Sequence, residues 1–155
     1  MTPAINTLKK CNITFKTHQY EHDPKHPSYG LEAAEKLAVD PAWVFKTLVA
    51  KIDNKQLVVA ILPVEHSLCL KSLANAYGGK RAEMADKNEV QRVTGYVLGG
   101  VSPVGQKKSL PTFIDANAEN LATMFVSAGK RGLEVELAPG DLKIATNAVF
   151  CPIIA

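Results

Sequence analysis

Two apolar, β-branched runs around a short polar turn constrain the fold more than any other feature of this sequence. The runs VFKTLVAK (44–51) and QLVVAIL (56–62) flank Asp53-Asn54, a dipeptide that favours a tight turn. They are therefore predicted to pair as an antiparallel hairpin. The second run is apolar on both faces, so we expect its strand to be covered on both sides.

Helix and strand signals follow one another irregularly along the rest of the chain. Helix formers and capping residues predict short helices at 3–11, 31–38, 66–79, 86–93 and 140–146. Further strands are predicted at 13–20, 95–98, 111–115, 123–129, 133–137 and 149–154. This order lacks the regular βαβ alternation of a doubly wound sheet. The predicted fold class is α+β, with a mixed, strongly curved, barrel-like sheet surrounded by helices.

Length and charge narrow the class of protein. A chain of 155 residues fits one hydrophobic core, so we expect a single domain over 1–155. The net charge of +3 permits contact with a polyanion, but the dense basic stripe of a DNA-binding protein is missing. No run approaches the roughly 20 apolar residues of a membrane span, and the first residues lack a secretory signal. We expect a cytoplasmic protein without membrane contact.

The sequence predicts neither a metal site nor a cofactor. Three cysteines lie far apart, which is not the spacing of a disulfide framework or a zinc site; we expect them to be small buried side chains: Cys11, Cys69 and Cys151. His18, His22 and His26 are spaced by four, but prolines in this segment prevent a common helical face.

Lys46 is the most informative single position. Strand alternation groups it with Val44, Leu48 and Ala50 on an otherwise apolar face. In one interpretation, its stem covers the core while the ammonium reaches solvent. In the other, the ammonium stands at the rim of a pocket and binds a phosphate, a carboxylate or a developing oxyanion. Both interpretations remain open at this point.

A second signal is the glycine-rich segment GYVLGGVSPVG (95–105). Gly99 and Gly100 allow a ligand to approach the backbone, Ser102 adds a hydroxyl and Pro103 stiffens the turn. The segment matches neither a dinucleotide fingerprint nor a Walker loop. By itself it predicts only a turn. On the strand 133–137, two glutamates two residues apart indicate a solvated face.

Taken together, VFKTLV (44–49), GYVLGGVSPVG (95–105) and GKRGLEVELAPGDL (129–142) resemble the YbaK/ProX family of aminoacyl-tRNA deacylases. Within that family the chain is most similar to the free-standing YbaK branch, which acts on Cys-tRNA(Pro). The resemblance extends from Thr7 to Ile154. It implies a curved mixed sheet, and a pocket between the lysine strand and the glycine loop for the aminoacyl ester at the 3′ end of tRNA.

The resemblance also implies roles for individual residues. Lys46 would bind the terminal phosphate or ribose and polarise the ester, while backbone groups of Gly99 and Gly100 would hold the substrate carbonyl or amine. The other residues implied for the pocket are Tyr20, Tyr29, Thr47, Ser102, Pro103, Ser127, Gly129 and Glu136. Thr47 and Lys46 lie on opposite strand faces, so both reach one site only if the strand twists or one acts through its backbone.

The implied activity is removal of cysteine from Cys-tRNA(Pro), and from Cys-tRNA(Cys) as a second substrate. The thiolate of the substrate cysteine would attack its own carbonyl, with attack by water as the alternative. A deacylase for another small residue, as in Ala-tRNA(Pro), and a non-catalytic module that binds a nucleotide or RNA end are the rival functions. The resemblance further implies docking on prolyl-tRNA synthetase, with no DNA partner.

Overall fold

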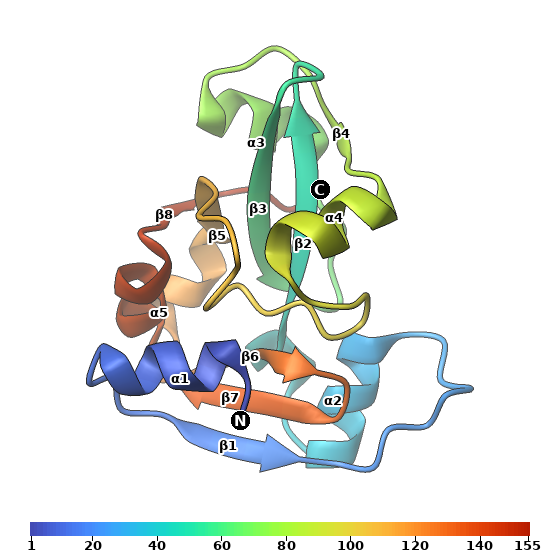
Figure 1. Ribbon diagram of the computed structural model, residues 1–155, viewed down its shortest axis with the longest axis vertical. Helices are drawn as coiled ribbons and strands as arrows, with labels where there is room; N and C mark the ends of the chain where they lie inside the picture. Colours follow the sequence, from blue (N-terminus) through green and yellow to red (C-terminus); the bar gives the residue numbers. More distant parts are fainter.

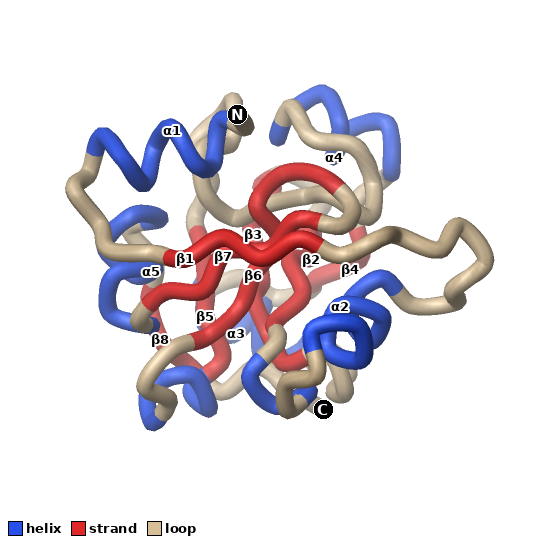
Figure 2. Tube along the Cα trace, turned by 90° about the horizontal axis from the view of Figure 1, so that it is seen from below, coloured by secondary structure: helices blue, strands red, loops and turns tan.

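The computed structural model describes all residues, 1–155, and contains two separate sheets with helices around them (Figures 1 and 2). The smaller sheet has the strand order β1-β7-β6 and the larger one β4-β2-β3-β5-β8. The strands are β1 (Lys16–Gln19), β2 (Phe45–Ile52), β3 (Gln56–Pro63), β4 (Ala82–Met84), β5 (Thr112–Asp115), β6 (Met124–Lys130), β7 (Leu133–Leu137) and β8 (Val149–Cys151). The helices are α1 (Pro3–Lys10), α2 (Tyr29–Leu37), α3 (Leu70–Tyr77), α4 (Lys87–Thr94) and α5 (Pro139–Thr146), with 3₁₀ turns at Pro41–Trp43 and Ala116–Asn120.

The predicted hairpin is confirmed. β2 and β3 pair antiparallel along their whole length, from Phe45 opposite Pro63 to Ile52 opposite Gln56. Both turn residues adopt the left-handed conformation, with φ of 51° at Asp53 and 57° at Asn54, which these residue types tolerate. Every β3 residue after Gln56 is buried, so both faces of this strand are covered, as its apolar run predicted.

The α+β class is confirmed, but closure of the sheet toward a barrel is not. β6 pairs with β7, and the backbone bridge between the two sheets is the isolated one that joins Phe125 of β6 to Val44, the residue before β2. Because no hydrogen-bonded ladder continues across this bridge, the two sheets stay separate. The predicted strand 95–98 is instead an irregular segment, since left-handed glycines stand at both of its ends, Gly95 with φ 81° and Gly99 with φ 83°.

Three clusters of buried side chains hold the elements together. The largest lies between the two sheets and includes α1, the inward face of β6 and β7, and Val101 and Val104 of the glycine loop. A second joins α3 to one face of β2 and β3. The third joins α2 to Val44 and Phe125, where the two sheets meet. None of the helices has the length and apolarity that crossing a membrane requires.

Candidate functional site

Lys46 and Thr47 stand at the base of β2, where this strand passes the smaller sheet. On one face of β2, Phe45 and Val49 belong to the large core; on the other, Val44 packs against Phe125 and α2. Alternation places Lys46 on the Val44 face and Thr47 on the Phe45 face, so the strand does not bring them to one side. The hydroxyl of Thr47 is buried without a hydrogen-bond partner.

The ammonium of Lys46 is partly desolvated. Burial lowers the pKa of Lys46 below its usual value of 10.5, and no carboxylate or hydrogen bond opposes this effect. The side chain is half-buried rather than extended into open solvent. A cation that is partly stripped of water and has no anionic partner is ready to bind an anion.

The glycine loop, residues 95–105, is pressed against the turn between β6 and β7 and against the start of α2. A side chain at Gly99 would come within 2.5 Å of Arg131 Nε and 2.8 Å of the Tyr29 ring. One at Gly100 would come within 2.9 Å of Lys130 Cα, which is backbone. Only glycine permits this approach at both positions. The Gly100 N–H donates to Val97 O, whereas the Gly99 N–H has no partner in the protein.

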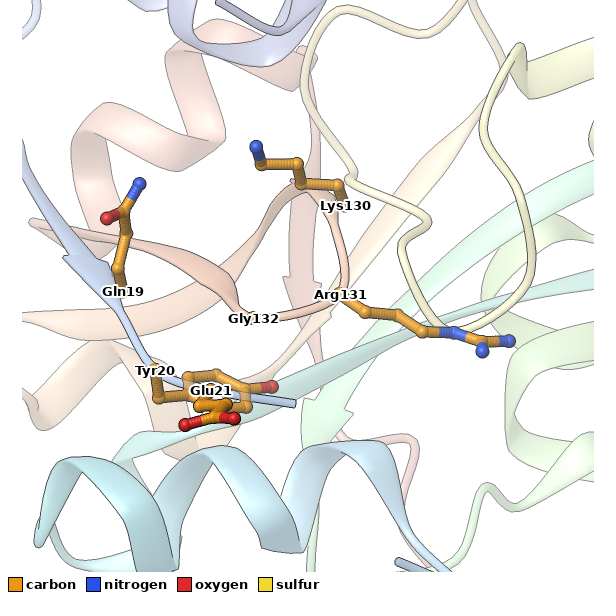
Figure 3. Close-up of a pocket in the computed structure, with 6 residues that line it drawn as sticks. All are labelled: Gln19, Tyr20, Glu21, Lys130, Arg131 and Gly132. Atoms are coloured by element: carbon orange, nitrogen blue, oxygen red, sulfur yellow. The ribbon is translucent and has the colours of Figure 1, made fainter. Parts of the chain in front are cut away.

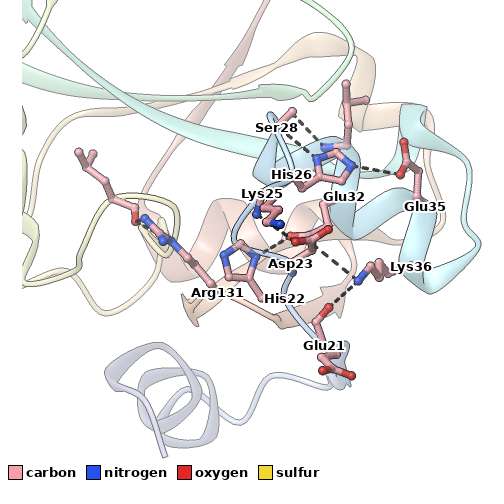
Figure 4. Close-up of polar contacts among 12 residues, drawn as sticks. Glu21, His22, Asp23, Lys25, His26, Ser28, Glu32, Glu35, Lys36 and Arg131 are labelled. Carbon is pink, nitrogen blue, oxygen red and sulfur yellow. Dashed lines mark hydrogen bonds and ion pairs between the residues drawn. The ribbon is translucent and has the colours of Figure 1, made fainter.

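Arg131 connects the glycine loop, the β6–β7 turn and the start of α2, and the place where these three segments meet is here called the junction. Its Nε and NH2 groups donate to Leu98 O at 3.1 and 2.8 Å, and its guanidinium stacks 4.4 Å from the centroid of the Tyr29 ring. Figure 4 shows Arg131 reaching from its turn toward the loop on one side and His22 lying beside it. Arg131 therefore joins the glycine loop, the β6–β7 turn and α2 at one place.

Tyr20 and Glu134 lie on the face of the smaller sheet that is turned away from the large core and toward α2. Glu134 pairs in register with His18 on β1 and Ser127 on β6, so these three side chains share one face of the sheet. Tyr20 comes two residues after His18 and therefore points to the same face. Burial raises the pKa of Glu134 to about 8. Burial, and then the charges of Glu134 and Glu32, raise the pKa of Tyr20 to about 12. The phenol therefore stays neutral, and Glu134 can hold or accept a proton near neutral pH.

A buried carboxylate anchors the segment after β1 to α2 (Figure 4). Glu32 Oε1 pairs with His22 Nδ1 at 2.7 Å, and Glu32 Oε2 accepts from the Asp23 N–H at 2.6 Å. Burial raises the pKa of Glu32, but these hydrogen bonds and the charge of Lys36 lower it overall. The Nε2 atom of His22 is buried without a partner. The other two histidines of the segment also pair with glutamates, His18 with Glu136 and His26 with Glu35.

A cavity of about 430 Å³ opens beside Tyr20 and Arg131 (Figure 3). The residues that line it are Gln19, Tyr20, Glu21, Lys130, Arg131 and Gly132. Arg131 leaves the turn in the opposite direction from Lys130, and the Tyr20 ring lies below the turn in this view. The cavity is thus an open entrance at the edge of the junction that Arg131 makes with Tyr29 and the glycine loop.

Four of the residues expected in the pocket make their contacts within the glycine loop and the smaller sheet. Ser102 is fully buried and its hydroxyl accepts from the Val104 N–H, and Pro103 is buried in the same loop. A side chain at Gly129 would meet Tyr96 and Thr2, on the side of the sheet away from Tyr20. Glu136 pairs with His18 and Thr123 at 2.9 and 2.6 Å. These four support the loop and the sheet.

Two expectations about side-chain exposure were wrong. Glu134 is only 6% exposed, so the two glutamates of β7 do not form a solvated face. The reason is that α2 and its loop cover this face of the smaller sheet, which alternation along one strand cannot reveal. The cysteines are not buried: Cys11 is exposed, and Cys69 and Cys151 are half-buried.

Comparison with known proteins decides the family. Residues 26–144, more than half of the chain, match the model of the aminoacyl-tRNA editing domain. The chain belongs to this family. EbsC of Enterococcus faecalis, which carries the provisional name Cys-tRNA(Pro)/Cys-tRNA(Cys) deacylase, is 36% identical over 98% of this chain and 92% of its own. The editing-domain protein described here is therefore an enzyme that acts on aminoacyl-tRNA.

Other relatives extend this comparison. A proline–tRNA ligase of Brachyspira hyodysenteriae is 29% identical over 69% of the editing-domain chain, which matches 20% of the ligase. Among solved structures, a trans-editing enzyme for prolyl-tRNA synthetase, so described provisionally, superposes with a TM-score of 0.85 at 20% identity and covers 100% of this chain and 99% of its own. The hypothetical protein APE2540 superposes with a TM-score of 0.87 at 24% identity, covering 99% and 100%. These two structures show the same fold.

The sequence patterns did not assign Arg131, His22, Glu32 or Glu134 to the pocket. The Lys130-Arg131 pair lies between the predicted strands 123–129 and 133–137, and no pattern in the letters shows that the Arg131 side chain stacks on Tyr29. His22 had been weighed only as a metal ligand. For Glu134, the cross-strand register with Ser127 and His18 would have been the signal, and it requires the strand pairing to be known.

The raised pKa of Glu134 makes a prediction about stability. The folded chain keeps this proton up to about pH 8, whereas an unfolded chain releases it near 4.5. The folded state therefore binds more protons across this window, and stability falls as pH rises through it. Glu134→Gln should remove this dependence and stabilise the protein at pH 8 by roughly 2 kcal/mol or more.

Urea unfolding at pH 4, 6 and 8 measures this effect. Glu65→Gln, at an exposed position, is the matched control and should follow the wild type. Parallel curves of stability against pH for the wild type and Glu134→Gln would show that Glu134 is ionised in the folded protein at neutral pH.

Proposed function

We propose that this enzyme removes cysteine from Cys-tRNA(Pro), with Cys-tRNA(Cys) as a second substrate. One observation carries the proposal: Lys46 is a partly desolvated cation without an anionic partner, while all three thiols of the chain lie on other elements. Cys11 follows α1, Cys69 precedes α3 and Cys151 ends β8. A site that has no thiol of its own suits a cysteinyl substrate, whose side chain supplies the attacking thiol. The name of EbsC, whose chain this one matches nearly end to end, supports the same substrate.

In the proposed reaction, Lys46 neutralises the terminal phosphate or the developing charge on the ester, and the free Gly99 N–H holds the substrate. The thiolate sulfur of the substrate cysteine attacks its own carbonyl carbon, and the ester bond to the ribose oxygen breaks. The thiol proton ends on that oxygen, so the products are a cyclic thioester and uncharged tRNA. The protein contributes position and charge, and these are the contributions that most accelerate such a step.

We further propose that docking on prolyl-tRNA synthetase presents the mischarged tRNA. The similarity to a segment of proline–tRNA ligases supports this partner, because those enzymes carry a related domain in their own chain. Charging of tRNA takes place in the cytoplasm, which is therefore the expected location of the reaction.

A panel of charged tRNAs tests the substrate. Cys-tRNA(Pro), Cys-tRNA(Cys), Ala-tRNA(Pro) and Pro-tRNA(Pro) are incubated with catalytic amounts of enzyme, and the released amino acid or its cyclic thioester is measured. The proposal expects multiple turnovers on the cysteinyl substrates and release of the thioester. Faster release of alanine would assign the enzyme to another amino acid, and binding without turnover would make it a non-catalytic module.

Removal of the protein's own thiols separates the two possible sources of sulfur. We expect the triple variant Cys11→Ser, Cys69→Ser, Cys151→Ala to keep deacylation within about threefold of the wild type, because none of these residues lies at the junction. Serine at position 69 retains the cap on α3, where Cys69 Sγ accepts from Ser72. A triple variant that is folded, by circular dichroism, but inactive would show that the attacking thiol belongs to the protein.

A further inference from the structure

We propose that a groove between α1 and β1, here called the α1–β1 groove, binds an unpaired nucleotide of the RNA adjoining the nucleotide at the junction. This proposal rests on the proposed function and adds a second RNA subsite to it. The groove has a volume of about 380 Å³. The lining residues that matter here are Ile5, Lys9, Phe15, Thr17, Gln19 and Lys130.

The floor of the groove suits a nucleobase. Ile5 on α1 is buried, and Phe15, which precedes β1, packs against the same core cluster while still lining the groove. Aromatic side chains are the usual stacking partners of unpaired bases, and stacking tolerates any base. Thr17 and Gln19 follow Phe15 at a spacing of two, on the same face of the strand, and both are exposed. Their side chains supply hydrogen-bonding groups beside the aromatic ring.

The rim of the groove suits a phosphate. Lys9 comes from the last turn of α1 and Lys130 from the end of β6, so two separate elements each contribute one cation. Neither lysine takes part in any of the six ion pairs of the structure. No acidic side chain lines the groove. Two unpaired lysines around an acid-free hollow attract the phosphodiester backbone of a nucleic acid.

The α1–β1 groove is continuous with the entrance to the junction. Gln19 and Lys130 line both this groove and the cavity that contains Tyr20 and Arg131. Figure 3 shows Gln19 and Lys130 pointing to the same side of the turn, away from Tyr20. From Phe15 to Gln19 the chain covers about 13 Å. An RNA strand that ends at the junction can therefore continue along β1 into the groove.

A second basic hollow, at the tip of the β2–β3 hairpin, provides the contrast. Its volume is about 940 Å³, and it is lined by Lys51, Asp53, Asn54, Lys55, Lys80, Arg81 and Glu83. No apolar side chain lines it. Lys51 pairs with Glu89 at 2.9 Å, and the Asp53 carboxylate lies within the hollow. This tip is at the opposite end of β2 from the junction (Figure 1). It offers charge without a surface on which a base could stack.

Two double variants with equal loss of charge test the proposal. Lys9→Ala with Lys130→Ala alters the groove, and Lys55→Ala with Lys80→Ala alters the tip. Binding of an uncharged single-stranded RNA ending in CCA is measured by fluorescence anisotropy at several salt concentrations. The groove variant should bind about 10-fold more weakly, and the slope of log K against log salt should fall by about one; the tip variant should stay within about twofold of the wild type.

A third variant tests the base. Phe15→Leu keeps an apolar side chain against the core and removes the ring, so RNA binding should weaken while the salt slope stays unchanged. On charged tRNA, the groove variant should raise KM by the same factor as it weakens binding. On an aminoacyl-adenosine, which has no adjoining nucleotide, its loss should be within about twofold.

Equal weakening by the two double variants would show general attraction of charge and overturn the proposal, as would no weakening by either. A loss of the same size on aminoacyl-adenosine would also overturn it, because Lys130 would then belong to the junction itself. If the wild type bound the RNA but deacylated neither substrate, the proposed function would fail while the binding measurements would still decide on the groove.

Discussion

Lys46→Ala is expected to lower kcat/KM for charged tRNA by about 10²–10³-fold, the effect of removing a preorganised group that stabilises charge in the transition state. Lys46 is half-buried, and the lowering of its pKa has desolvation as its only cause. No acidic side chain of the protein pairs with the ammonium group of Lys46, so its charge is available to the substrate. Single-turnover release of labelled cysteine from Cys-tRNA(Pro) measures the loss.

Lys51→Ala is the matched control on the same strand. Lys51 pairs with Glu89 at the other end of β2, so its removal should leave kcat/KM within about twofold and reduce stability only slightly. Lys46→Ala itself should unfold at the same temperature as the wild type or higher, because a partly desolvated charge is removed. If a folded Lys46→Ala protein kept its activity, Lys46 would be a structural residue of β2 that takes no part in the reaction.

Gly100→Ala is expected to lower kcat/KM by about 10²-fold, since displacement of a binding group by about 1 Å has consequences of this size. An added Cβ would lie 2.9 Å from Lys130 Cα and 3.2 Å from Arg131 N. Both atoms are backbone, so no side chain can rotate out of the way. The loop must then move from the β6–β7 turn, which disturbs the contact of Arg131 with Leu98 and displaces the free Gly99 N–H.

Gly140→Ala serves as the control for a glycine substitution. Gly140 lies in the first turn of α5, and a side chain there would meet nothing within 4 Å. This variant should keep full activity and gain about 0.4–1 kcal/mol of stability, because alanine restricts the unfolded chain. The same deacylation assay and a thermal melt compare the two variants. Wild-type activity in Gly100→Ala would mean that the loop does not need its close approach to the turn.

The strongest local signals of the sequence predicted their elements well. The Asp53-Asn54 turn between two β-branched runs and the capping residue Asp86 each act through neighbours in the chain, so a short window contains the information. Asp86 indeed accepts hydrogen bonds from the N–H groups of Asn88 and Glu89 at the start of α4. The strand predicted at 95–98 failed because two left-handed glycines outweighed the β propensity of the residues between them.

Local sequence patterns could not decide which glutamate of β7 has an unusual environment. Glu134 and Glu136 have the same parity on β7, so strand alternation cannot distinguish them. In the structure, Glu136 is held by His18 and Thr123, whereas Glu134 is buried beside Tyr20 with a raised pKa. The difference arises from the neighbours that each side chain meets in the folded protein, and alternation along one strand does not contain this information.

The sequence by itself determined the pairing of β2 with β3, the α+β class, and the two segments that carry Lys46 and the glycines, because each depends on residues close together in the chain. Only the tertiary structure decided that the sheets remain separate, that Arg131 contacts both Leu98 and Tyr29, and that Glu134 is buried away from solvent. These features depend on contacts between residues 33 to 114 positions apart in the chain. Contacts of that kind follow from how whole elements pack, and no periodicity within a single element encodes them.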